Sequence, residues 1–211
     1  MRAQRGIAWS RITTKGVAAH GSAPERGVNA IDHMAAIVRE LNASLPDITH
    51  PVVGAPTINI GTIHGGEKLN IIPASCVIEI DRRTIPGETN EEVIAQFEAA
   101  IERARSVHPE IDASVEIVDS GMPFEVDQDS ELVRTMAMAA EEATGRETEI
   151  IGFRGASDAR FLVEAGAETI VFGPGDIAVA HTARESIDLD GLVDGAMAYA
   201  LAFARLLGGA R

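Results

Sequence analysis

The sequence contains a single cysteine, Cys76, and lacks a long uninterrupted apolar run. One cysteine excludes an internal disulfide and a zinc site built from several thiolates, and it is typical of a reducing compartment. Cys76 stands in an alternating apolar pattern, which favours a buried small side chain over a reactive thiol. Residues 1–10 have no apolar signal-peptide core, and Arg205 interrupts the most apolar stretch, residues 196–207. We therefore expect a cytoplasmic protein without a membrane span.

The sequence also has few basic residues. It contains 18 lysines and arginines and 32 acidic residues, which give a formal net charge of −14. Phosphate backbones and anionic lipids repel such a chain, so the sequence argues against nucleic-acid and membrane partners. A hydrophobic content of 45% over 211 residues is enough to bury a core. Size permits one large domain or two small ones.

Apolar periodicity in the first part of the chain predicts strands and helices in a defined order. The expected elements are a strand over 6–14, a helix from Asn29 that ends before Pro46, strands over 57–64 and 70–83, a helix over 90–107 and a strand over 113–118. Asn29 and Asp32 resemble a capping box, and Gly65-Gly66 suits an antiparallel hairpin. The order β-α-β-β-α-β is the ferredoxin-like arrangement. We place this first domain at residues 5–118.

Residues 119–211 show helices that alternate with short apolar strands. The expected elements are a helix over 130–144, a strand over 149–153, a helix over 159–165, a strand over 169–172 and a helix over 188–207. Such alternation is typical of a parallel or mixed sheet covered on both faces. Open sheets of this kind normally contain about four to six strands. The sequence therefore predicts an incomplete α/β domain.

Two of the six histidines stand in contexts suited to chemistry. His20 lies among small residues between a strand and a helix, where functional loops are commonly mounted. His181 follows the predicted strand over 169–172 and the turn Gly173-Pro174-Gly175, at a strand end where α/β proteins bind ligands. A neutral imidazole there suits zinc, and a plain loop histidine is the alternative. The other histidines are expected on the surface, in loops or at helix caps: His33, His50, His64 and His108.

The pair Arg82-Arg83 has two interpretations. The two residues are either exposed at a sheet edge, or one of them uses its guanidinium to bind a substrate carboxylate through two parallel hydrogen bonds. Asn70 is likewise a turn residue or an amide donor to the same substrate. The glycine clusters around Gly65 and Gly173 precede neither a helix nor a Lys-Ser/Thr pair, so no nucleotide site is expected.

Five motifs occur one after another along the chain. They are Gly16-x-Ala18-Ala19-His20-Gly21-Ser22-x-Pro24 with Gly27-Val28-Asn29-Ala30-Ile31, Gly65-Gly66-x-x-x-Asn70-x-x-Pro73, Asp81-x-Arg83-x-x-Pro86-Gly87, Ser157-Asp158-Ala159-Arg160-Phe161, and Gly173-Pro174-Gly175 with His181-Thr182 and Glu185. Together they resemble the two-metal amidohydrolase family of acetylornithine deacetylase, succinyl-diaminopimelate desuccinylase and carboxypeptidase G. The resemblance spans almost the whole chain.

The resemblance implies a ferredoxin-like dimerisation lid, followed by the closing part of a zinc-exopeptidase-type catalytic domain over 119–211. It implies a homodimer in which the lid histidine, His20, reaches the partner's active site and polarises the scissile amide carbonyl. Asn70 and Arg83 match lid positions that hold the substrate carboxylate. Gly155 and Ser157 match the loop that lines the acyl pocket, and His181 matches a histidine that completes one of the two metal sites.

The family's other metal ligands lie upstream of the lid, so no residue of this chain matches them. A complete enzyme would hold two zinc or cobalt ions, which lower the pKa of a bridging water, whereas this chain would bind one ion weakly at most. Ala156 stands where some desuccinylases have threonine, which favours a deacetylase or a broader N-acyl amino acid hydrolase. We expect the C-terminal portion of an N-acetylornithine deacetylase-like amidohydrolase, inactive alone. The alternative is a stand-alone dimerisation or amino-acid-binding module without catalysis.

Overall fold

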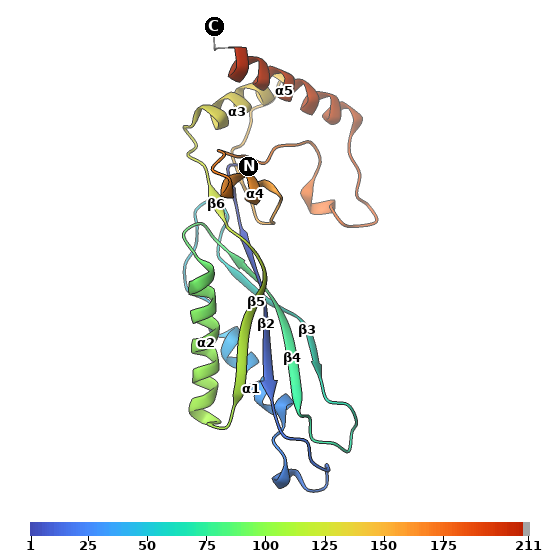
Figure 1. Ribbon diagram of the computed structural model, residues 1–211. Coiled ribbons are helices and arrows are strands. Elements are labelled where there is room, and N and C mark those ends of the chain that lie inside the picture. The colour runs from blue at the N-terminus through green and yellow to red at the C-terminus, as the bar shows by residue number, and fades with distance from the viewer. Residues whose placement is uncertain (209–211) are drawn as a thin grey trace. The chain divides into compact units, whose positions relative to one another are not determined.

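The chain folds into two compact units in a computed structural model that describes residues 1–208 (Figure 1). The first unit is Arg5–Pro123. The second combines Met1–Gln4 with the described residues from Phe124 onward. The extreme N-terminus therefore belongs to the same unit as the C-terminal part of the chain.

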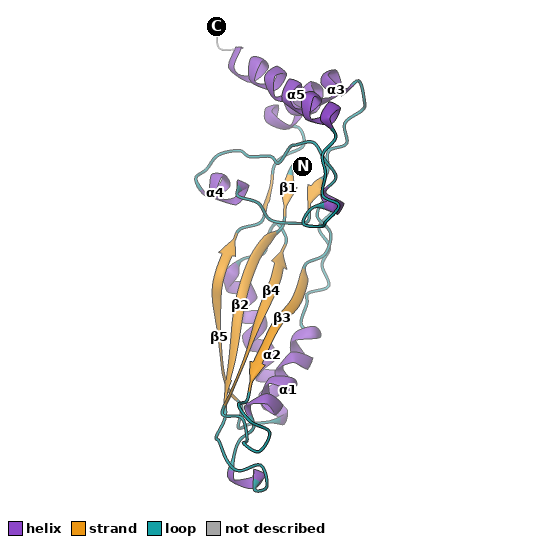
Figure 2. Ribbon diagram, turned by 90° about the vertical axis from the view of Figure 1, so that its right-hand side faces the viewer, coloured by secondary structure: helices purple, strands orange, loops and turns teal. Residues whose placement is uncertain are grey.

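The first unit is a four-stranded antiparallel sheet with helices on one face (Figure 2). Its strands are β2 (Gly6–Lys15), β3 (Thr57–Gly65), β4 (Ser75–Thr84) and β5 (Asp112–Gly121), and its long helices are α1 (Ala30–Asn42) and α2 (Asn90–Val107). The strands lie in the order β3-β4-β2-β5. This arrangement confirms the ferredoxin-like prediction.

Side chains at the helix starts satisfy backbone donors that have no partner inside the helix. The side chain of Asn29 accepts a hydrogen bond of 2.9 Å from the N–H of Ile31 at the start of α1. Thr89 and Glu92 form a reciprocal capping box at the start of α2. Each cap contributes about 1 kcal/mol to helix stability, so the sequence sets both starting points locally.

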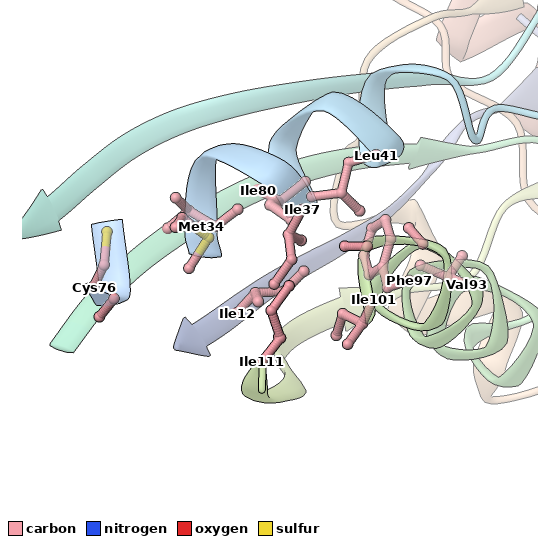
Figure 3. Packing of buried hydrophobic residues seen from close by; sticks show 14 of the residues in the cluster. Ile12, Met34, Ile37, Leu41, Cys76, Ile80, Val93, Phe97, Ile101 and Ile111 are labelled. Atoms are coloured by element: carbon pink, nitrogen blue, oxygen red, sulfur yellow. The ribbon is translucent and has the colours of Figure 1, made fainter. Parts of the chain in front are cut away.

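The core of the first unit lies between the sheet and its two helices (Figure 3). The labelled side chains come from β2, β4, both helices and the turn before β5: Ile12, Cys76, Ile80, Met34, Ile37, Leu41, Val93, Phe97, Ile101 and Ile111. Full burial of a large aliphatic or aromatic side chain contributes about 1.5–3 kcal/mol. The predicted burial of Cys76 is confirmed, and desolvation raises the pKa of its thiol.

Arg82 departs from the predicted exposed edge pair. Strand β4 lies between β3 and β2, and the Arg82 side chain is buried in the unit with 1% of the residue exposed. Its guanidinium contacts Glu88 at 2.5 Å and donates to Gln96 at 3.2 Å. Gln96 in turn donates to Ser44 at 2.9 Å. The edge interpretation is wrong for this residue because a central strand has no free edge.

His33 also differs from its predicted surface or capping role. Its side chain is 6% exposed, and Nε2 lies 3.4 Å from a carboxylate oxygen of Glu110. It shares one face of α1 with Ala30 and Ile37, at helical spacing. The pKa of Glu110 is lowered, first by a hydrogen bond from the backbone N–H of Glu110 to its own carboxylate and then by the contact with His33.

The outer face of the sheet carries an ion-pair cluster across three strands. Arg11 of β2 donates to Glu79 of β4 and to Glu116 of β5, each at 3.0 Å. Thr62 of β3 also donates to Glu79, at 3.3 Å. The hydrogen bond from Arg11, followed by that from Thr62, lowers the pKa of Glu79 below its ordinary value of 4.5.

Arg11→Gln is expected to raise the pKa of Glu79 towards 4.5, because the largest interaction that stabilises its ionised form is lost. A carboxyl group with a lowered pKa stabilises the fold at neutral pH, and that contribution disappears as the pH falls through its folded pKa. Carboxyl NMR titration of the wild type and the variant measures the shift. Arg39→Gln on α1 is the control, and an unchanged Glu79 titration in Arg11→Gln would contradict the prediction.

The second unit contains a mixed sheet of very short strands. Strand β1 (Ala3–Gln4) pairs antiparallel with β6 (Phe124–Glu125) and parallel with β7 (Gly152–Phe153). Its helices are α3 (Glu131–Thr144), α4 (Ala159–Glu164) and α5 (Leu189–Gly208). Small residues let α3 and α5 pack closely: Ala139, Ala140, Ala198 and Ala202.

The predicted strands of the second unit are shorter than expected or missing. The strand expected over 149–153 is reduced to β7. Residues 169–172, all within the described part of the chain, form no strand, although Val171 exchanges two backbone hydrogen bonds with Met1. An apolar run becomes a strand only where a neighbouring backbone continues the ladder. Beside residues 169–172, the neighbouring backbone that forms these hydrogen bonds is the single residue Met1.

Helix α5 is long and apolar enough to cross a membrane by length and composition. Core helices of soluble proteins pass the same test, and α5 carries Asp190, Asp194 and Arg205. One face packs against α3. Large apolar side chains of α5 remain exposed: Leu189, Leu192, Val193, Met197, Phe203 and Leu207. The absence of a membrane span therefore stays a prediction.

Candidate functional site

Two loops meet at one end of the first unit. The loop over 16–29 joins β2 to α1, and the loop over 66–74 joins β3 to β4. The N–H of Gly21 donates to the carbonyl of Asn70 at 2.8 Å, and His20 pairs with Ile71 in a short β-bridge. The structure therefore brings His20 and Asn70 to the same tip.

Glycine is required for the close approach of these backbones. A Cβ atom at Gly16 would lie 2.1 Å from the carbonyl oxygen of Val28, and one at Gly27 would lie 2.7 Å from the carbonyl oxygen of Val17. Neither carbonyl can move without breaking the hydrogen bonds that Val17 and Val28 exchange. Gly16 and Gly27 thus serve the packing of the loop that carries His20.

The imidazole of His20 is exposed and is held on one side only. Its Nδ1 lies 2.8 Å from the hydroxyl oxygen of Ser22 and 3.2 Å from the Ser22 backbone nitrogen. Within residues 1–208, no side chain or carbonyl contacts Nε2 at hydrogen-bond distance. The side chain of Asn70 is also exposed. This tip can therefore offer both an imidazole and an amide to a bound molecule.

Arg83 lies at the opposite end of β4 from His20 and Asn70. The hydrogen bond from Gly16 to Ala74 places the loop tip beside the start of β4. Arg83 stands eight residues beyond Ser75, about 26 Å away along an extended strand. Its guanidinium forms an ion pair of 2.8 Å with Asp81. Arg83 and His20 of one chain cannot contact the same small substrate.

Ser157 belongs to the second unit, where it bonds to a residue that sequence reasoning missed. Its hydroxyl donates to Gln4 Oε1 at 2.5 Å, and Gln4 Nε2 donates to the Ser157 carbonyl at 3.4 Å. Gln4 is fully buried. The Ser157 hydroxyl thus donates its proton to Gln4, and its oxygen accepts a hydrogen bond of 3.4 Å from the N–H of Ala159. No local pattern links Gln4 to a loop so distant in sequence.

Gly155 lies against the ring of Phe153, which would have to move to admit a larger residue. A Cβ atom there would lie 2.5 Å from the ring of Phe153. The chain therefore turns back closely over that aromatic side chain between β7 and Ser157.

His181 adopts an unusual backbone conformation after a short 3-10 helix, Ile177–Val179. Its φ angle of 62° is the only positive value among the non-glycine residues that the structure describes. Its N–H donates to a carboxylate oxygen of Glu185 at 2.6 Å. Residues held in such regions cost about 1–3 kcal/mol each and cluster at functional sites.

The described residues do not fit a two-metal centre by themselves. Among residues 1–208, no group of three or more His, Cys, Asp or Glu side chains is arranged to hold a metal ion. Beside His181, one carboxylate oxygen of Glu185 accepts the His181 backbone N–H. A hollow of about 710 Å³ opens beside this segment, lined mainly by apolar residues that include Met136, Phe172 and Ile187.

Comparisons with known proteins cover both units. Residues 2–108 match the family described as peptidase dimerisation domain. Acetylornithine deacetylase of Myxococcus xanthus is 31% identical over 219 residues, which cover 99% of this chain and 55% of that protein. The enzyme of the same name from Erwinia tasmaniensis is 30% identical over 194 residues, with 89% and 49% covered. The chain thus spans about half the length of these curated relatives.

Solved structures show the same fold. A tripeptidase from Staphylococcus aureus aligns with a TM-score of 0.81 at 21% identity, over 99% of this chain and 53% of its own. The aminopeptidase PepT from Bacillus cereus aligns with a TM-score of 0.75 at 25% identity, over 98% and 53%. Both likenesses extend across the two units described above.

Proposed function

The chain belongs to the peptidase dimerisation domain family of metal-dependent peptidases and amidohydrolases, and we propose that it supplies the lid and closing catalytic segment of an N-acyl amino acid hydrolase. The observation that carries this proposal is the loop tip of the first unit, where an exposed His20 with a free Nε2 stands beside Asn70. The curated relatives named acetylornithine deacetylase support N-acetylornithine as the substrate to test first.

In the proposed reaction, the side chains of this chain bind and polarise the substrate. His20 donates a hydrogen bond to the scissile carbonyl oxygen and stabilises the negative charge that develops there. Asn70 donates to the substrate near the same tip. Arg83 would hold a carboxylate in a different active site, because it lies at the far end of β4.

The second unit contributes the remaining predicted contacts. Gly155 and Ser157 would line the acyl pocket, with Gln4 as the support of that loop. His181 would be one metal ligand in a site that holds zinc or cobalt. Because the described residues do not fit a two-metal centre alone, no metal-dependent step is assigned to this chain. A homodimer through the first unit and a cytoplasmic location complete the proposal.

One observation favours a second candidate function. The first unit closes its own core, whereas the second shows no metal-binding group within residues 1–208. A stand-alone dimerisation or amino-acid-binding module would need only the first unit. Such a module would bind an amino acid saturably and hydrolyse nothing.

A chimera separates the two functions. The part of the Myxococcus xanthus enzyme that lies outside the match is joined upstream of Met1, and hydrolysis of N-acetylornithine is measured with zinc or cobalt. We expect metal-dependent hydrolysis by the chimera and none by the 211-residue chain alone. A chimera carrying His181→Ala is the matched control for the metal site. A folded, dimeric chimera that binds the substrate without cleaving it would favour the binding module.

A further inference from the structure

Both hydrogen bonds to the His20 ring reach the same atom. The N–H of Ser22 lies 3.2 Å from Nδ1, and the Ser22 hydroxyl lies 2.8 Å from it. A backbone N–H can only donate, so Nδ1 must present its lone pair. A neutral imidazole with a lone pair on Nδ1 carries its single proton on Nε2.

The backbone around His20 restricts where that proton points. Gly21 donates to Asn70, Ile72 donates to Ala19, and Ala23 donates to the His20 carbonyl, each at 2.8 Å. The main chain is thus fixed before and after the histidine. With Nδ1 held by Ser22, the Nε2–H bond faces away from the loop, on the exposed side of the ring.

We propose that Ser22 is a positioning residue that commits His20 to the Nε2–H tautomer and aims this donor at the substrate carbonyl. The inference rests on the proposed function of His20. A carbonyl oxygen accepts a hydrogen bond, so the other tautomer would present a lone pair to it and repel it. Ser22 therefore removes the unproductive form of the ring before a substrate arrives.

The same chain contains a histidine with half of this arrangement. The backbone N–H groups of Val52 and Val53 lie 3.2 and 3.4 Å from Nδ1 of His50. Backbone donors therefore also direct the Nδ1 lone pair of His50, but the residue two positions further on is Val52, which has no hydroxyl. His50 is thus an internal reference that changes at Ser22 should not affect.

Long-range ¹H–¹⁵N NMR of the labelled 211-residue chain tests the tautomer directly. At a pH where imidazoles are neutral, we expect Nδ1 of His20 and of His50 to show the shifts of unprotonated nitrogen. Ser22→Ala removes the hydroxyl, which makes the shorter of the two contacts, and keeps the backbone donor at 3.2 Å. It should therefore move the His20 shifts part of the way towards those of a mixture of tautomers and leave His50 unchanged. Ser22→Thr keeps the hydroxyl and should restore the wild-type shifts. A proton on Nδ1 of wild-type His20, or identical His20 shifts in wild type and Ser22→Ala, would overturn the proposal.

Kinetics of the chimera add a second measurement. Loss of one hydrogen bond worth about 1 kcal/mol predicts a roughly fivefold lower kcat for Ser22→Ala, with KM unchanged and kcat restored by Ser22→Thr. A rise in KM with unchanged kcat would contradict a positioning role. An inactive chimera would count against the proposed function alone, because the NMR result does not depend on catalysis.

Discussion

Glu88→Ala is expected to destabilise the first unit by about 3–5 kcal/mol, because it leaves a buried guanidinium without its counterion. The Arg82 side chain is 1% exposed and that of Glu88 is 12% exposed, so water cannot replace the missing carboxylate. Glu88 also accepts a hydrogen bond of 2.8 Å from the N–H of Ile85. The substitution therefore opens the turn between β4 and α2 as well as the ion pair.

Trp9 gives a direct readout of this loss. It is the only tryptophan of the chain and lies on β2 of the first unit, so its fluorescence follows unfolding in urea. Glu98→Ala changes an exposed carboxylate on α2 and should stay within about 0.5 kcal/mol of the wild type. Replacing both partners, in Arg82→Met with Glu88→Leu, should recover much of the stability, because no unpaired charge is then buried. Equal stability of Glu88→Ala and Glu98→Ala would show that the pair contributes little.

His20→Ala is expected to lower the kcat of the active chimera by about 10²–10³, the range measured for removal of one donor to a developing oxyanion. The side chain is exposed, and among residues 1–208 its ring hydrogen-bonds to Ser22 alone, so its removal should leave the first unit folded. KM should change much less than kcat, since the interaction strengthens as charge develops on the carbonyl oxygen.

A second exposed histidine of the same unit provides the control. His64 lies at the end of β3 and has no assigned role in catalysis, so His64→Ala should keep the wild-type kcat. Urea unfolding of both variants checks that they are equally stable. If His20→Ala retained full kcat while the chimera remained metal-dependent, the assignment of His20 to the scissile carbonyl would be wrong.

The fold of the first unit follows from periodicity that can be read in the sequence. Alternation of period two places Cys76, Ile78 and Ile80 on the inner face of β4. The same alternation places Arg82 on the inner face and turns Arg83 outward, so the sequence pattern alone could have predicted the burial of Arg82. The pattern could not predict its partner, because Glu88 lies in a turn whose path depends on tertiary packing.

The candidate site is less accessible to such reasoning. His20 and Asn70 lie in loops without periodicity, and only the family motifs connected them before the structure showed the bond from Gly21. The contact between Gln4 and Ser157 joins residues that are 153 positions apart and has no local signature. In the second unit, residues 169–172 have strand composition but lack neighbouring strands, which single-sequence patterns do not reveal.

The apolar side chains that α4 and α5 leave uncovered affect the fate of the protein in a cell. Phe161 and Leu162 of α4 and Phe203 of α5 are each more than half exposed. Chaperones and proteases recognise surface of this kind as a sign of incomplete folding. The lifetime of the chain would then depend on how quickly that surface is covered.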